Sequence, residues 1–369
     1  MAARRLQGPD RIVTAAPSAT PWSRRSLPDL LAAHGLDGVP EGAFPNDGWS
    51  GASLTALERG GRRFILKRTS WATDWIARST RDRALREAVL AADPVPLAPP
   101  LAAAHLGAAA DGNSAAILMP DLSASLIPWE QGGGGAVVVS GGTLDRVLAA
   151  VAAIHVLPWD RLRDTHDGLG WPWCPVRERI QLLSRPSAER YRAGGLWVGE
   201  RFLAGWDAFD RKAPRAALDL VAGVSRDPAA LISALERLPA TGLHGDLKFA
   251  NLALLPEGTT AAIDWQMTSW APVALDLGWF LVANIAQLRD EPDSILERYR
   301  GALATAGGQA LVGDWATQRD FAIIVGLLLR GWRKGLDAEA GVVLPSGRPA
   351  TDDLAWWSAE AVAAAARRL

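Results

Sequence analysis

The sequence predicts an α+β protein, with a small antiparallel sheet followed by a larger, mainly helical part. One observation is a hairpin signal, because two strand-like runs flank the turn Arg59-Gly60-Gly61-Arg62. Another is the helical spacing of apolar residues over 143–156. Further helical segments are expected at 176–193, 197–222, 227–238, 272–287, 292–306, 315–335 and 352–368.

Composition limits the class of protein. The chain has 369 residues, of which 49% are hydrophobic and 21% charged, as in soluble globular proteins. A net charge of −1 gives no general attraction to nucleic acid or to an anionic membrane. The single cysteine, Cys174, cannot form an intramolecular disulfide, and we expect a buried structural thiol. The first 25 residues contain no signal-peptide core, and the longest apolar run, 321–329, is too short to span a bilayer. We therefore expect a cytoplasmic protein.

The segment 243–264 carries the chemistry. His244-Gly245-Asp246 opens a loop that ends in Asn251, and Asp264 lies thirteen residues further on, after a strand-like run. The spacing D-x-x-x-x-N is typical of a phosphoryl-transfer loop, in which Asp orients the acceptor hydroxyl and Asn holds Mg²⁺. The two oxygen ligands Asn251 and Asp264 suit a hard cation that keeps some of its waters. A polar turn would explain His-Gly-Asp alone, but the complete set in order favours phosphoryl transfer.

This segment resembles the aminoglycoside phosphotransferase and choline kinase group of small-molecule kinases, which have a bilobal protein-kinase-like fold. In that group the loop begins His-Gly-Asp, and the second Asp commonly lies in a tripeptide such as Ile263-Asp264-Trp265. The resemblance implies ATP and Mg²⁺ as cofactors, with Asp246 facing the acceptor hydroxyl and Asn251 and Asp264 as metal ligands. By the same resemblance, Lys248 would neutralise charge on the transferring phosphoryl group.

Lys67 and Glu87 are the candidates for positioning the nucleotide. Lys67 stands in the strand-like run Phe64-Ile-Leu-Lys and resembles the lysine that contacts the α- and β-phosphates in kinases. A helix predicted over 78–91 contains Glu87, which we expect to orient Lys67. Local ion pairs of Glu87 with Arg83 or Arg86 are the alternative.

Two further segments would complete the nucleotide site. Gly48 and Gly51 precede the first strand and are predicted to belong to a cover over the nucleotide. Their spacing is not G-x-G-x-x-G, however, and an ordinary turn would use them equally well. Met119, Asp121 and Leu122 follow an apolar run and form the predicted hinge between the lobes, whose backbone would bind the adenine edge.

The resemblance covers about residues 45–285 and implies three regions. We expect an irregular arm at 1–40 with at most one helix, a nucleotide-covering lobe at 41–120, and a lobe at 121–369 that carries the catalytic hairpin and the acceptor site. Asp276 resembles an Asp that braces the catalytic loop in this group. Only eleven residues separate it from Asp264, which leaves no room for the activation segment of a protein kinase.

Two alternatives to a small-molecule kinase remain at this point. One is a protein kinase, against which the short segment after Asp264 argues. The other is a catalytically weak nucleotide-binding regulator, which would have no need of Asp246. Neither a nucleic-acid nor a membrane partner is indicated, and the oligomeric state is left open.

The distribution of charge suggests the kind of acceptor. Residues 1–120 hold 14 basic and 11 acidic side chains, whereas residues 252–369 hold 10 basic and 14 acidic ones. Because a cleft lined by acids concentrates cations, we expect a neutral or cationic hydroxylated acceptor, such as an amino sugar, an aminoglycoside or an amino alcohol. Solvated helix faces are the alternative location for these acids. The acids expected at the acceptor site are Asp290, Glu291, Asp293, Asp352 and Asp353.

Overall fold

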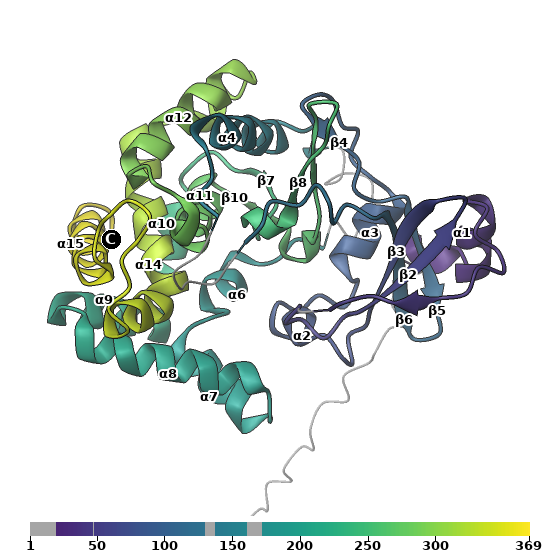
Figure 1. Ribbon diagram of the computed structural model, residues 1–369. Helices are drawn as coiled ribbons and strands as arrows, with labels where there is room; N and C mark the ends of the chain where they lie inside the picture. Colours follow the sequence, from purple (N-terminus) through teal and green to yellow (C-terminus); the bar gives the residue numbers. More distant parts are fainter. Residues whose placement is uncertain (1–19, 47, 130–136, 161–171) are drawn as a thin grey trace, which may run out of the picture.

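The computed structural model describes residues 20–46, 48–129, 137–160 and 172–369, so the first nineteen residues of the expected N-terminal arm lie outside the described part. The chain forms two lobes (Figure 1). The smaller lobe is built on an antiparallel sheet in the order β1-β2-β3-β6-β5, and the larger lobe is mainly helical. This confirms the predicted α+β bilobal architecture.

The sheet of the small lobe contains the predicted hairpin. Strands β2 and β3 pair antiparallel with Arg59 opposite Arg62, and both glycines between them have positive φ. That conformation is the one a two-residue hairpin turn requires, and glycine adopts it without a steric penalty. The strands are β1 (Gly42–Ala43), β2 (Ser53–Arg59), β3 (Arg62–Thr69), β5 (Gly107–Asp111) and β6 (Ser114–Pro120).

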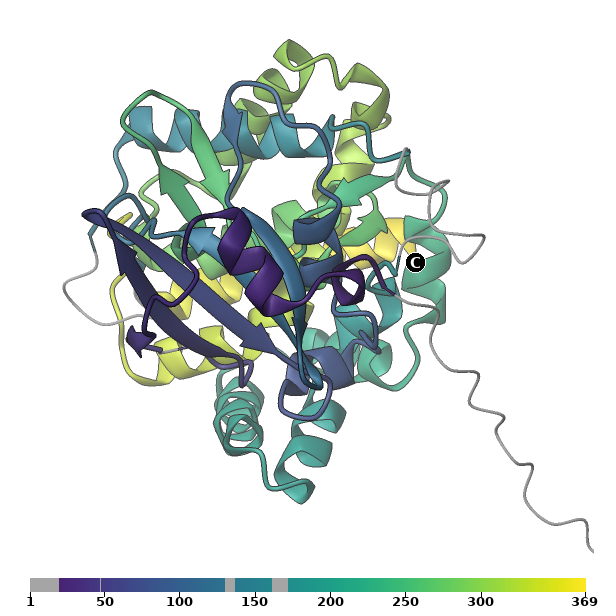
Figure 2. The same cartoon turned by 90° about the vertical axis from the view of Figure 1, so that its right-hand side faces the viewer.

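Strand alternation decides which side chains of β3 face which layer. Phe64 and Leu66 pack with Leu30 of helix α1 (Leu27–Ala33), which covers one face of the sheet (Figure 2). Ile65 packs on the opposite face with residues of helix α3 (Arg86–Ala92). Because successive side chains of a strand point to opposite faces, Lys67 lies on the same face as Ile65, toward α3.

The helix predicted over 78–91 is wrong in its extent. Two short helices occupy this region, α2 (Trp75–Ser79) and α3 (Arg86–Ala92). Arg81 and Leu85 between them have φ of 57° and 58°, a left-handed conformation that interrupts any α-helix. Both carboxylate oxygens of Asp82 accept a hydrogen bond from the Arg86 amide at 2.9 Å, so the new helix begins there. Glu87 consequently lies in the first turn of α3.

The helices of the large lobe follow the predicted order, with two of the expected spans divided. Ser184, which caps α7, and Pro214, which precedes α9, each begin a new helix where one continuous helix was expected. Helix α14 packs against α8, α11 and α15 and forms the centre of the lobe. The helices are α4 (Gly141–His155), α6 (Val176–Gln181), α7 (Arg185–Ala193), α8 (Trp197–Lys212), α9 (Arg215–Arg226), α10 (Ala229–Leu235), α11 (Ala274–Ala283), α12 (Pro292–Thr305), α13 (Gln309–Val312), α14 (Trp315–Glu339) and α15 (Ala350–Arg368).

Short strands in the large lobe hold the segments of chemical interest. β8 (Leu252–Leu254) and β9 (Thr260–Ala262) form a hairpin beside β4 (Leu101–Ala102), and β7 (Thr241–Leu243) pairs with β10 (Ser269–Ala271). These pairings bring the loop 244–251 next to the segment 263–268. None of the helices in the described part of the chain combines the length and the apolar character that a membrane span requires.

Candidate active site

A cleft of about 730 Å³ lies between the lobes. Its walls include ten of the eleven predicted site residues: Gly48, Lys67, Glu87, Met119, Asp121, Leu122, Asp246, Lys248, Asn251 and Asp264. Gly51 does not line it. The φ of Gly51 is 95°, and a Cβ at this position would lie 2.5 Å from the carbonyl oxygen of Thr73. Gly51 is therefore required for the close packing of its own segment, which precedes β2, against the chain before α2.

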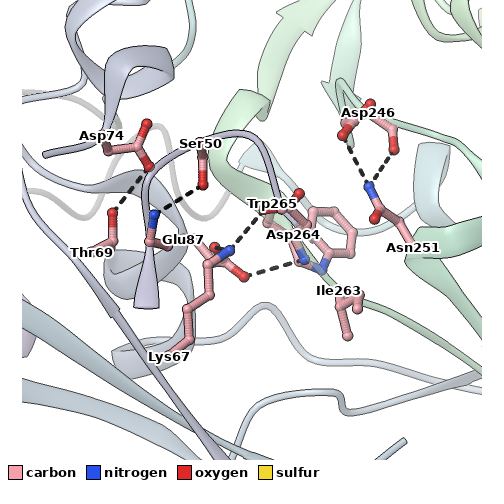
Figure 3. Close-up of polar contacts among 12 residues, drawn as sticks. Ser50, Lys67, Thr69, Asp74, Glu87, Asp246, Asn251, Ile263, Asp264 and Trp265 are labelled. Atoms are coloured by element: carbon pink, nitrogen blue, oxygen red, sulfur yellow. Dashed lines mark hydrogen bonds and ion pairs between the residues drawn. The ribbon is translucent and has the colours of Figure 1, made fainter. Parts of the chain in front are cut away.

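Lys67 lies at the centre of an ion-pair network that joins the two lobes (Figure 3). Its Nζ lies 2.6 Å from Oε2 of Glu87 and 2.8 Å from Oδ1 of Asp264. The other carboxylate oxygen of Glu87 accepts a hydrogen bond from the Asp264 amide at 3.2 Å. Burial by itself would lower the pKa of Lys67, but the charges of Asp264 and Glu87 outweigh burial and raise it, so the ammonium stays charged.

Glu87 makes this contact in place of the local ion pairs that were the alternative. Arg86 donates instead to the carbonyl oxygen of Gln266 at 3.1 Å, and Arg83 lies over the ring of Trp71. Burial would raise the pKa of Glu87, yet Lys67 and the neighbouring His105 together outweigh burial and lower it. The carboxylate is therefore ionised and directed at Lys67.

The loop 244–251 is held by a buried carboxylate on α11. Asp276 accepts hydrogen bonds from the backbone amides of His244 and Gly245, both at 2.9 Å. Behind it, His155 Nε2 lies 3.2 Å from Asp276, and His155 Nδ1 lies 2.6 Å from the Tyr299 hydroxyl. His155 thus belongs to the support of this loop. Charge-assisted hydrogen bonds of this kind restrict the loop to one conformation.

Gly245 has a conformation and a packing that only glycine allows. Its φ is 85°, and a Cβ there would lie 2.0 Å from the carbonyl oxygen of Met267. The loop therefore lies directly against the segment that follows Asp264. His244 accepts a hydrogen bond from the Asp246 amide at Nδ1, and its Nε2 contacts the Ile263 carbonyl oxygen at 3.0 Å. Burial lowers the pKa of His244, which matches a neutral ring with the proton on Nε2.

Asp246 has one engaged and one available carboxylate oxygen. Oδ2 accepts a hydrogen bond from Asn251 Nδ2 and lies within ion-pair distance of Lys248 Nζ, both at 3.1 Å. Oδ1 is buried and has no hydrogen-bond partner among the described residues. Burial would raise the pKa of Asp246, but Lys248 and Arg179 outweigh it and lower the pKa. A carboxylate oxygen lining the cleft is thus charged at neutral pH and able to accept a proton donor.

Asn251 and Asp264 fit the requirements of a magnesium site. Asn251 Nδ2 donates to the backbone and side chain of Asp246, which leaves its Oδ1 for a cation. Asp264 has φ 66° and ψ 56°, a conformation that Asp tolerates better than most residues, and Lys67 engages only its Oδ1. These are hard oxygen donors of the type that Mg²⁺ takes together with water and phosphate. Elsewhere in the described ranges no group of three or more His, Cys, Asp or Glu side chains could hold a metal.

The hinge residues lie where β6 leaves the small lobe. The Asp121 amide donates to the Arg63 carbonyl oxygen at 3.0 Å, so it is already engaged. The Leu122 carbonyl oxygen accepts from the amides of Ser125 and Leu126. The Leu122 amide, in contrast, donates no hydrogen bond to any described residue. It is the hinge donor that remains for a ligand in the cleft.

The acids expected at the acceptor site do not line the cleft, so the charge argument assigned them to the wrong place. They lie on or beside α12 and α15, and arginines and lysines that come mostly from other elements pair with them, which a count along the sequence does not reveal. Four of the five form ion pairs: Asp290 with Arg298, Glu291 with Arg348, Asp293 with Arg319, and Asp353 with Lys334.

The sequence did not identify the residues on the helical side of the cleft. Arg179, Arg201 and Arg330 line it, together with aromatic side chains that include Trp279 and Trp332. Each arginine belongs to a different helix, α6, α8 and α14 respectively. The one local signal was Arg330 itself, which ends the apolar run of α14, where a charged residue is costly unless it has a role.

A two-lobed fold with a cleft between the lobes, lined by Lys67, Asp246 and Asp264, defines a phosphotransferase of the kinase-like type. Residues 42–319 match the model of the phosphotransferase enzyme family, and the chain belongs to that family.

Solved structures with a similar fold include several phosphotransferases. An aminoglycoside-3′-phosphotransferase of type VIII is 20% identical, with a TM-score of 0.40 and coverage of 82% of this chain and 98% of that one. A spectinomycin phosphotransferase, solved with ADP and spectinomycin, is 13% identical, with a TM-score of 0.39 and coverage of 90% and 98%. A choline kinase from Streptococcus pneumoniae is 11% identical, with a TM-score of 0.44 and coverage of 88% and 93%. Comparison with curated proteins gives no significant match.

Proposed function

We propose that this protein is an ATP- and Mg²⁺-dependent phosphotransferase that phosphorylates a hydroxyl group of a small molecule. The observation that carries the proposal is the carboxylate of Asp246. One of its oxygens has no partner among the described residues, while its neighbours Asn251 and Lys248 hold the other. A general base needs such an oxygen within hydrogen-bond reach of the acceptor hydroxyl.

Seven of the predicted site residues then have a role in the transfer. Lys67, oriented by Glu87, binds the α- and β-phosphates, and the Leu122 amide binds the adenine edge. Oδ1 of Asp246 accepts the hydroxyl proton as the acceptor oxygen bonds to the γ-phosphorus and the bond to the ADP oxygen breaks. Lys248 compensates negative charge on the transferring group. Mg²⁺, held by Asn251 and Asp264, would supply charge neutralisation between the phosphates.

Specific observations argue against the two alternatives. A regulator that only binds nucleotide would not need a buried carboxylate oxygen beside the phosphate site, because such a charge is costly to maintain. A protein kinase needs a long segment after its metal-binding Asp. Here β10 follows Asp264 almost at once and α11 begins at Ala274, so the connection is short.

An amino sugar, an aminoglycoside or an amino alcohol is within the range of acceptors that the family resemblance suggests. The acids on which the expectation of a cationic acceptor depended lie outside the cleft, so charge no longer supports it. The acceptor class therefore has to be argued from the residues that do line the cleft.

The proposal is tested with the variant Asp246→Asn. We expect acceptor-dependent formation of ADP to fall by roughly 10²- to 10⁴-fold, the range for loss of acid–base assistance, while affinity for MgATP stays near that of the wild type. Asp207→Asn is the matched control, because Asp207 is an exposed acid on α8 that pairs with Arg185 at the surface. Turnover of Asp246→Asn equal to that of Asp207→Asn would refute the assigned role.

A further inference from the structure

The helical side of the cleft contains buried donors without acceptors. Arg179 and Arg330 are 1% and 6% exposed. Arg179 Nη1 and Arg330 Nε have no hydrogen-bond partner among the described residues. The indole Nε1 of Trp279, which lines the same cleft, likewise has none there. Buried polar groups are nearly always satisfied, so three unsatisfied donors in one cavity require an explanation.

These three donors lie close together. The guanidinium of Arg179 is 4.7 Å from the centroid of the Trp279 ring, and that of Arg330 is 5.7 Å from it. Arg330 also lies 5.5 Å from the Trp332 ring. Stacking on aromatic faces holds a guanidinium in position while leaving the N–H groups at its edge available. The guanidinium groups of Arg179 and Arg330 thus both lie beside one indole, with unpartnered N–H groups on each.

The positive charge of Arg179 and Arg330 is not matched by an ion pair. Neither side chain forms a salt bridge with a carboxylate in the described part of the chain, although Arg179 Nε donates to the Gly245 carbonyl oxygen at 2.9 Å. Among the acids of the cleft, Glu87 and Asp264 pair with Lys67, and Asp246 pairs with Lys248. Burial, followed by the neighbouring Arg333, lowers the pKa of Arg330 to about 10, although the charges of Asp337 and Asp246 act to raise it, and the group is still charged at neutral pH.

Arg330 also occupies a distinct position in its helix. α14 is kinked at this residue, with φ −133° and ψ 17° inside an otherwise helical segment. The charged side chain that lines the cleft therefore comes from an irregular turn. Arg333 and Lys334, on the next turn, instead pair with Asp337 and Asp353. A purely structural arginine would be expected to find a carboxylate in the same way.

We propose that the acceptor is a hydroxyl-bearing molecule that also carries a carboxylate, with Arg330 as the principal carboxylate-binding residue and Arg179 and Trp279 as supporting donors. A set of donors without acceptors is complementary to an oxyanion and not to an ammonium group. The Nε edge of a guanidinium can bind the two oxygens of a carboxylate side by side. Arg179 donates to the carbonyl oxygen of Gly245, the residue before Asp246. A carboxylate bound by Arg179 would therefore lie near the hydroxyl that faces Asp246, so both groups belong to one compact acceptor. This inference rests on the proposed function.

The experiment uses acceptors that share a carbon skeleton and differ in charge. One set is para-hydroxymethyl benzoate, its amide and the corresponding benzylamine, and a second is hydroxybutanoate, hydroxybutanamide and aminobutanol. ADP formation with MgATP is measured for the wild type, Arg330→Gln and the control Arg211→Gln. Arg211 lies on α8 and pairs with Glu339 at the surface. Thermal shift in the presence of MgADP gives a binding readout that does not depend on turnover.

We expect the carboxylate of each set to be the best ligand. Arg330→Gln should raise the KM for the carboxylate by roughly 10- to 100-fold, as for loss of a charged hydrogen bond, with little change for the amide. The control variant should behave as the wild type. When no member of the panel drives turnover, a thermal shift specific to the carboxylate and lost in Arg330→Gln supports the inference.

Four results would overturn the inference, and three of them concern how the acceptors and Arg330→Gln respond. These are equal response to all members of a set, preference for the amine, and an increase in the KM for ATP in Arg330→Gln with no change toward the acceptor. The last would mean that the arginine binds the nucleotide phosphates. In each of these cases, ADP formation that depends on both an acceptor and Asp246 leaves the proposed phosphotransferase function standing. Absence of any carboxylate-specific turnover or shift also overturns the inference.

Discussion

Replacing Gly245 by alanine should show how far turnover depends on the close contact of this loop with Met267, independently of the stability of the fold. The residue has φ 85°, and its added Cβ would lie 2.0 Å from the Met267 carbonyl oxygen. Contacts of a Cβ below 3.0 Å essentially never occur, so the loop and the Met267 segment must separate by about 1 Å. The left-handed conformation adds roughly 1–2 kcal/mol for a residue with a side chain. Misplacement by about 1 Å is expected to reduce turnover by roughly 10²-fold.

Gly258→Ala is a matched control for this prediction. Gly258 also has positive φ, at 94°, but a Cβ there would meet no atom within 4 Å. Both variants therefore carry the conformational cost, and only Gly245→Ala carries the clash. Urea denaturation gives the free energy of unfolding of each variant, and steady-state kinetics gives kcat. If the two variants lose stability equally and keep the same kcat, the close contact between the loop and Met267 has no functional consequence and the reasoning is refuted.

Three further predictions concern the side of the cleft proposed to bind the nucleotide. Asp264→Ala should abolish the dependence of nucleotide affinity on Mg²⁺, since it removes the anionic ligand; an unchanged Mg²⁺ dependence in titrations would exclude Asp264 as a ligand. Lys67→Met and Glu87→Gln should be non-additive in kcat/KM by roughly 0.5–3 kcal/mol, and strict additivity would contradict their pairing. Because the folded state lowers the pKa of Glu87 from its ordinary 4.5 to about 2, this carboxylate stabilises the fold above pH 4.5 and progressively less below it. The difference in unfolding free energy between wild type and Glu87→Gln should therefore narrow as pH falls from about 5 toward 2.

The parts of the site that sequence could predict are those that depend on local patterns. Alternation along β3 assigns Lys67 to the inner face, and a fixed spacing along one loop brings Asp246 and Asn251 together. The helix over 78–91 was predicted wrongly because Arg81 and Leu85 adopt positive φ, which their helix propensity does not indicate. A local sequence pattern does not reveal where tertiary structure overrides helix propensity.

The helical wall of the cleft could not be predicted, for a different reason. Arg179, Trp279 and Arg330 come from α6, α11 and α14. About a hundred residues of sequence separate the first two, and about fifty separate the last two. Their convergence depends on how the three helices pack, and each residue alone resembles an ordinary helical position. The charge argument failed for the same reason, since summing charge over 252–369 ignores which acids already pair with basic residues of the same or a neighbouring helix.

The two halves of the candidate site are fixed from different lobes. The loop that carries Asp246 is held within the large lobe, through Asp276 and the buried pair of His155 and Tyr299 behind it. Asp264 is held across the cleft, because Lys67 on the sheet and Glu87 on α3 both bind it. A change in the position of the small lobe would therefore move the groups that contact Asp264, whereas the contacts of Asp276 with the loop lie within the large lobe. The loop is nevertheless tied to the segment around Asp264, because His244 contacts the Ile263 carbonyl oxygen and Gly245 lies against Met267.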